Sequence, residues 1–386
     1  MSKGRAILVW TLVGLATLIT LISSLTIWTK RQLLDTDNWT NTSGQLLADP
    51  TVRSALSNRL VDLLYQRVDV ESAIRQELPK QAQPLAGTLA AGIQTAAIRG
   101  TEAFLATPQA QSAWEEANRR AHGALVDVLE GNNVRHVETA NGSLVLDLRP
   151  LLQRISDRIG IADKLKANAS PTTGEIVLLK SDQLKNAQNA VKVFKTLSIF
   201  VVIAVFVLYG LAIALARPRR RTVLLVSGST LLGVGLLLVI VRRVAGNVLV
   251  DSVVKVESSK LAVNHIWAIG TTLLRDIAVA LILYGLLAII AALLAGPSRA
   301  AVWTRRTMAP AWRNHAVAVY AIAVLVILIF WAWSPIVQGR RWEGSLVLAL
   351  LILLGLEVWR RQTIREFPGE QQETVEAPPA PGPTSP

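Results

Sequence analysis

Cysteine is absent from the 386 residues of the chain, and histidine occurs only four times. Without cysteine there is no disulfide, no thiol nucleophile and no thiolate metal site. The large polar segment 29–195 must therefore be held together by an ordinary apolar core, and it is long enough to form one.

Known enzyme signatures are also missing. The sequence contains no phosphate loop, no dinucleotide fingerprint and no Gly-x-Ser-x-Gly elbow. Ser252-Val-Val-Lys255 has the Ser-x-x-Lys spacing of acyl-serine enzymes, but the second triplet that such enzymes need does not accompany it. We therefore expect no enzyme activity, no catalytic residue, no cofactor and no bound metal.

Ionisable residues are almost absent from the long apolar runs, and Glu357 is the exception. We expect it to pair with Arg360 or Arg361, which lie one helical turn along. Ion and proton transport normally requires charged groups inside the spans, so a proton-coupled pump is disfavoured.

The sequence is rich in long apolar runs, with 51% hydrophobic residues and a mean hydropathy of +0.40. Runs of about 20 apolar residues are the length at which a helix crosses a bilayer. We therefore predict an α-helical polytopic membrane protein with six spans, and a mainly α, α+β extracytoplasmic domain between the first two. The predicted spans are residues 6–28, 196–216, 222–241, 277–296, 316–333 and 344–359.

The net charge of +13 lies mostly beside these runs, because residues 29–195 hold twenty lysines and arginines against eighteen acids. Arginines flanking apolar spans mark the cytoplasmic side, whereas nucleic-acid binding would need a basic folded face. We predict a plasma-membrane protein with both termini cytoplasmic, residues 29–195 extracytoplasmic, and no nucleic-acid partner. The arginines that set this topology are Arg217, Arg219, Arg220, Arg221, Arg305 and Arg306.

The predicted domains follow from this topology. Residues 1–28 form an uncleaved signal-anchor span, with Lys3 and Arg5 holding its amino end inside. Residues 29–181 form a helical extracytoplasmic domain with a small β-sheet, and residues 182–366 a membrane domain of five further spans. The proline-rich residues 367–386 form a disordered cytoplasmic tail.

Short sequence patterns predict where helices and strands begin and end in the outer domain. Asp49-Pro50 and Thr107-Pro108 each place a capping side chain before a proline, which is typical of a helix start. Gly131 ends the second of these helices. Asn141-Gly142 lies between alternating residues and predicts a β-hairpin, followed by a helix from Pro150 and a third strand over 175–180.

A long helix is predicted where the outer domain enters the membrane. Ser181 is a natural N-cap, and no proline interrupts the chain from Asp182 to Ala216. This helix would form a rod about 50 Å long.

The span 222–241 contains Ser229 and Gly233, whose spacing suits close helix packing in lipid. The outer loop 242–275 follows. There Asp251 and Lys255 are placed for an i,i+4 pair, and we expect a turn at Ser258-Ser259 between two helical extensions.

A polar cluster lies on the helix after Thr107. Trp114, Asn118 and His122 share one face at helical spacing, with Glu115 beside them. Glu115, Asn118 and His122 could form a ligand or metal site, although the pattern is not His-Glu-x-x-His. The alternative is a helix face that hydrogen-bonds a neighbouring helix.

This cluster contributes to a family resemblance, together with Asp147-Leu-Arg-Pro150 and the segment from Lys180-Ser-Asp-Gln-Leu184 to Ala190. Across roughly residues 30–300 the chain resembles a family of uncharacterised actinobacterial multi-pass integral membrane proteins, which have an amino-terminal anchor and a helical outer domain. The resemblance implies an actinobacterial cell envelope. It implies no activity or substrate.

Three functions remain open, and the third is an envelope enzyme, which would need Glu115 and His122 to converge on a pocket. The chain is expected to be a non-enzymatic envelope scaffold or sensor, whose outer domain binds a partner and is coupled to the spans by the continuous helix. The alternative is a transporter or flippase of a lipid-like molecule. The expected partners are the lipid bilayer and another envelope protein or a lipid.

Overall fold

The computed structural model describes residues 2–67, 70–132, 137–140, 143–147, 175–179, 181–253, 257–333 and 342–368. The helix expected from Pro150 and residues 369–386 of the proline-rich tail lie outside these residues. The chain divides into two compact units. One comprises Met1–Val13, Leu211–Leu232 and Leu281–Pro386, and the other Gly14–Gly210 and Gly233–Ala280.

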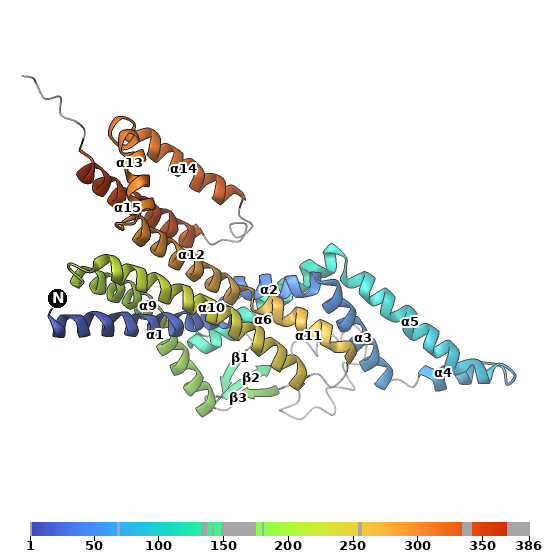
Figure 1. The fold of residues 1–386 in the computed structure, drawn as a ribbon. Helices are drawn as coiled ribbons and strands as arrows, with labels where there is room; N and C mark the ends of the chain where they lie inside the picture. Colours follow the sequence, from blue (N-terminus) through green and yellow to red (C-terminus); the bar gives the residue numbers. More distant parts are fainter. Residues whose placement is uncertain are drawn as a thin grey trace, which may run out of the picture. The chain divides into compact units, whose positions relative to one another are not determined.

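Helices make up most of the polar segment after the first long helix, as Figure 1 shows. Helix α2 packs mainly on α6, while α5 contacts α3 and α4. The elements are α2 (Thr36–Ala48), α3 (Pro50–Arg67), α4 (Val70–Glu77), the 3-10 turn η1 (Gln83–Leu85), α5 (Ala86–Leu105) and α6 (Pro108–Glu130).

Capping side chains explain where these helices begin. Asp35 accepts a hydrogen bond from the Asn38 amide, and Asp49 accepts one from the Val52 amide at 3.1 Å. Thr107 accepts one from the Ala110 amide at 3.3 Å. Each bond satisfies an amide that has no partner within its own helix. Gly131 ends α6 with a φ of 83°, a conformation that glycine adopts without steric cost.

Among the described residues, three short strands form one antiparallel sheet in the order β1-β2-β3. Ala140 pairs with Ser143, which leaves two residues for the connection, the length that an Asn-Gly hairpin requires. Residues 141–142 themselves are not among those described. The strands are β1 (Val137–Ala140), β2 (Ser143–Asp147) and β3 (Glu175–Leu179).

In the part of the chain that the structure describes, four helices are long and apolar enough to cross a membrane, judged by length and composition: α1 (Lys3–Leu34), α9 (Ser181–Leu215), α10 (Arg220–Val253) and α12 (Thr272–Leu294). A fifth is added if α13 (Arg299–Asn314) and α14 (Ala316–Trp333), which meet at a bend of 111°, form one broken span. Within the described residues α15 (Trp342–Glu366) is not among these candidates. The fold is thus that of a mainly helical membrane protein.

Two connections between the long helices are themselves largely helical. Helix α10 continues to Val253 and α11 (Glu257–Gly270) follows, in agreement with the two helical extensions expected there. Ser258-Ser259 lies within α11, so the turn expected at these two residues is wrong. Asp251 lies 4.0 Å from Lys260, while Lys255 is outside the described residues. The cytoplasmic loop expected between 296 and 316 contains α13.

Helices α10 and α12 touch through their backbones at Gly228 and Gly285. A Cβ atom on Gly285 would lie 2.6 Å from the Gly228 carbonyl oxygen and 2.6 Å from the Leu232 amide nitrogen. Gly233, in the predicted packing pair, has nothing within 4 Å of its Cβ position, and Ser229 is exposed. The close contact therefore lies one residue from Ser229, on a different side of the helix.

Candidate functional site

The polar cluster on α6 faces α2. The Trp114 indole donates a hydrogen bond to the Ser43 carbonyl at 3.1 Å. Glu115 lies over Gly44, where a Cβ atom would be 2.5 Å from the Glu115 carboxylate. Trp114 and Glu115, two of the four predicted residues, therefore both contact α2.

His122 belongs to the same interface and is buried. Its Nδ1 lies 3.1 Å from the Thr36 hydroxyl, and its ring stacks on Trp39 with centroids 5.1 Å apart. Burial lowers the pKa of His122 below its ordinary value, although the Leu33 backbone and the Asp35 carboxylate act in the opposite direction. The imidazole thus joins the amino end of α2 to α6.

Asn118 does not join the cluster, because its amide donates to the Trp114 carbonyl of its own helix at 2.9 Å. Arg119 instead reaches α2 and pairs with Asp37 at 2.5 Å. Among the described residues no three His, Cys, Asp or Glu side chains converge as metal ligands. The geometry of this cluster is that of a helix-helix contact.

Asp49 and His265 form a contact that the sequence did not suggest, because 216 residues separate them. Their side chains meet at 2.8 Å, where α11 packs on the corner between α2 and α3. Burial tends to raise the pKa of Asp49, but the His265 side chain and the Val52 and Thr51 amides outweigh it and hold that pKa below its ordinary value.

The predicted topology arginines divide into different structural roles. Arg305 is 2% exposed and donates to the carbonyls of Leu294 and Gly296 at the end of α12. It also binds both carboxylate oxygens of Glu366, at 2.7 and 3.1 Å. A signal for this role exists in the sequence, since Arg305 lies between Ala301 and Ala309 at helical spacing.

Two more side chains cap the same helix end. Arg221 donates to the Ala292 carbonyl at 2.8 Å, and Gln362 donates to the Ala295 carbonyl at 3.2 Å. Carbonyls in a last helical turn lack intrahelical partners and carry partial negative charge, so cationic donors stabilise them. The end of α12 is thereby joined to α10, α13 and α15.

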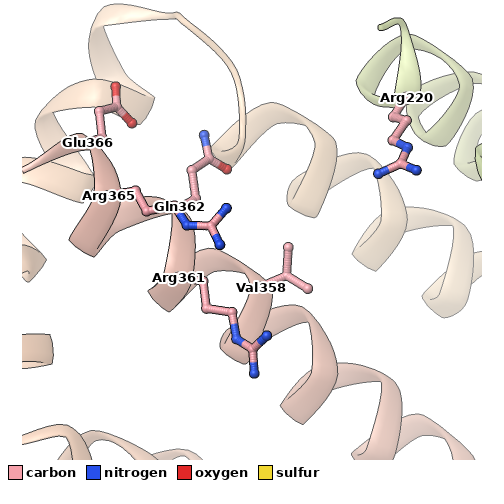
Figure 2. A pocket seen from close by; sticks show the side chains of 6 residues that line it. All are labelled: Arg220, Val358, Arg361, Gln362, Arg365 and Glu366. Carbon is pink, nitrogen blue, oxygen red and sulfur yellow. The ribbon is translucent and has the colours of Figure 1, made fainter. Parts of the chain in front are cut away.

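Next to this capped end lies a pocket of about 650 Å³. Figure 2 shows that Arg220 comes from one helix, while the other lining side chains lie along α15. Its lining contains three arginines. The residues are Arg220, Val358, Arg361, Gln362, Arg365 and Glu366.

Among the described residues, two of the three arginines of this pocket, Arg220 and Arg365, have no ion pair. Arg361 donates to Glu357 at 2.6 Å, as expected for that glutamate, but remains 69% exposed. Arg220 makes one weak bond, to the Ala214 carbonyl at 3.5 Å. Arg365 has no hydrogen bond or ion pair with any described residue. The pocket can therefore receive an anion. The remaining topology arginines, Arg217, Arg219 and Arg306, are exposed.

Comparisons with protein-family models, with curated proteins and with solved structures give no match.

Proposed function

We propose that the chain is a six-span plasma-membrane protein with both termini in the cytoplasm and an α+β domain, residues 29–181, outside. It acts as an envelope scaffold or sensor. The outer domain binds a partner, and α9 couples that domain to the spans. The observation that carries the proposal is the set of contacts along one face of α9.

The outer half of α9 is joined to the end of α6. Gln188 donates to the Val128 carbonyl at 2.8 Å, and two turns later Lys195 pairs with Glu130. Helix α6 is the same helix whose other contacts bind α2. A displacement of α6 by a bound partner would therefore act on α9.

The membrane half of α9 is joined to α1. Lys30 donates to the Ser198 hydroxyl at 3.0 Å, and Thr17 and Tyr209 share a hydrogen bond of 3.1 Å. At 3.6 residues per turn, the contacting positions 188, 195, 198 and 209 fall within an arc of about 80°. One face of α9 thus contacts α6 and then α1.

Because α9 is one continuous helix, it can transmit movement from the outer domain to the spans. Helix α9 runs without interruption from Ser181 to Leu215, which corresponds to roughly 52 Å. A continuous hydrogen-bonded helix resists bending, so a shift of its outer end is passed in part to its membrane end.

The absence of native cysteine allows a direct test of the topology. Single cysteines are introduced as Asn118→Cys and Arg306→Cys, and intact cells are treated with a membrane-impermeant maleimide. Labelling of the first variant and protection of the second are expected. The reverse pattern would overturn the topology.

Coupling is tested after crosslinking and mass spectrometry have recovered the outer partner. The labelling rate of an Arg217→Cys reporter is measured with and without that partner. A partner-dependent rate is expected, lost in Glu130→Lys and in Lys195→Glu and restored when both charges are exchanged. A rate that does not respond to the partner contradicts coupling.

A further inference from the structure

We propose that the pocket formed by Arg220, Arg361 and Arg365 binds the phosphate headgroup of an anionic phospholipid, whose acyl chains lie along the exposed face of α15. The inference depends on the proposed topology only for the side of the membrane. It does not depend on coupling through α9.

Charge favours an anionic occupant. Arginine forms two-pronged hydrogen bonds with phosphate oxygens, and three arginines face this pocket. The one acid in its lining, Glu366, has both carboxylate oxygens bound to Arg305. Arg361 pairs with Glu357, so the positive charge that remains in the pocket is that of Arg220 and Arg365.

The pocket continues into an apolar stripe, and this favours a lipid over free phosphate. Four exposed apolar side chains precede Arg361 and Arg365 at alternating intervals of four and three residues, so all six lie on one face of α15. The four are Val347, Leu351, Leu354 and Val358, with exposures of 39%, 45%, 53% and 64%. A molecule that is apolar along most of its length and anionic at one end matches this face.

The neighbouring helix indicates the depth of the pocket in the membrane. Helix α13 turns away from α14 by 111° and buries Ala301, Arg305, Ala309 and Trp312 on one side. Trp303, on another side, is 69% exposed. An amphipathic helix with an exposed tryptophan is typical of the membrane interface, where headgroup phosphates lie.

The volume of the pocket is also large enough for a phospholipid headgroup. About 650 Å³ is within the range of ordinary small-molecule sites and exceeds what a single phosphate fills. It leaves room for a glycerol or a second small headgroup substituent beside the phosphate.

Native mass spectrometry of the full chain in detergent tests the proposal. Phosphatidylglycerol and phosphatidylcholine with identical acyl chains are titrated separately. Preferential binding of phosphatidylglycerol is expected, and equal binding of the two lipids would overturn the proposal. This comparison uses the unaltered chain, so it does not depend on whether any variant folds.

The variant Arg220→Gln/Arg365→Gln removes two pocket charges that make little or no contact within the protein. Phosphatidylglycerol binding is expected to weaken about 30-fold, since each basic residue near a headgroup contributes about a factor of five. The matched control Arg299→Gln/Arg306→Gln removes two exposed charges from α13 and is expected to change binding less than about twofold. Equal losses in both variants would show nonspecific attraction and overturn the site.

Competition experiments distinguish a lipid headgroup from a soluble phosphate as the ligand of the pocket. Inorganic phosphate and glycerol 3-phosphate are expected to displace phosphatidylglycerol weakly, because neither can use the apolar stripe. Leu351→Ser/Leu354→Ser changes two stripe residues that do not line the pocket, and it is expected to weaken phosphatidylglycerol binding without altering glycerol phosphate binding. Tight binding of inorganic phosphate, with no effect of the stripe variant, would identify a soluble-anion site and reject the lipid.

Discussion

Arg305 and Glu366 form a two-pronged ion pair, with the Nε–Oε2 and Nη2–Oε1 distances at 2.7 and 3.1 Å. The guanidinium is 2% exposed and also donates to two carbonyls of the α12 end, so one side chain fixes three elements. A guanidinium can serve all these acceptors because its donors lie in one rigid plane. Arg305, which the sequence predicts to mark the cytoplasmic side, thus connects α13 to the end of α12 and to α15.

Arg305→Ala is expected to destabilise the protein by about 3 kcal/mol, because it leaves buried carbonyls and one carboxylate without a donor. Arg305→Lys should recover only part of this loss, since an ammonium lacks the planar fork. Arg306→Ala, the exposed neighbour, should change stability by less than about 0.5 kcal/mol. Thermal unfolding in detergent measures all three, and an unchanged Arg305→Ala melt would contradict the role.

The glycine contact between α10 and α12 gives a second prediction. Gly285→Ala places a Cβ atom 2.6 Å from backbone atoms that cannot move aside cheaply, so a loss of about 1–3 kcal/mol is expected. Gly233→Ala meets no neighbour within 4 Å and should be neutral or stabilising, because alanine has the higher helix propensity. If the two variants melt alike, the helices do not touch at Gly285.

The Asp49–His265 contact predicts an acid-dependent loss of stability. The pKa of Asp49 is lowered in the folded protein, so its contribution is complete above the ordinary value of 3.8 and is lost as the pH falls through the lowered value. Asp49→Asn keeps a capping oxygen for α3 but removes the charge. The melting temperature of this variant should depend less on pH below about 4. If the melting temperature falls equally steeply with pH in the variant and in the unaltered protein, Asp49 is not the cause.

His122 predicts a change at milder pH. Its pKa is lowered, so the folded protein binds fewer protons than the unfolded chain below the ordinary value of 6.5, and stability should decrease as the pH falls below that value. His122→Phe keeps an aromatic ring against Trp39 and should flatten this dependence. His315→Phe replaces an exposed histidine and should leave it unchanged. Melting between pH 5 and 8 distinguishes them.

Local signals account for much of the agreement between sequence and structure. Asp35, Asp49 and Thr107 act as N-caps through atoms within three residues of themselves, so their roles can be predicted from neighbouring residues alone. The strands expected around Asn141-Gly142 coincide with β1 and β2 for the same reason. Proline-free sequence likewise predicts the continuous α9.

The contacts of the polar cluster on α6 could not be predicted from nearby residues alone. Helical periodicity placed Trp114, Asn118 and His122 on one face, but it could not identify what lies opposite. The structure has α2 there, and Trp114 and His122 contact it while Asn118 turns back to its own helix.

The sequence by itself determined the membrane class, the apolar helices and the positions where most outer helices begin, because these depend on composition and on atoms near in the chain. Tertiary structure alone decided that Gly228 rather than Gly233 lies at a helix crossing, and that Asp49 meets His265. It also assembled Arg220 with Arg361 and Arg365 around one pocket. Such choices depend on the rotation and offset of each helix against its neighbours, which local sequence leaves free.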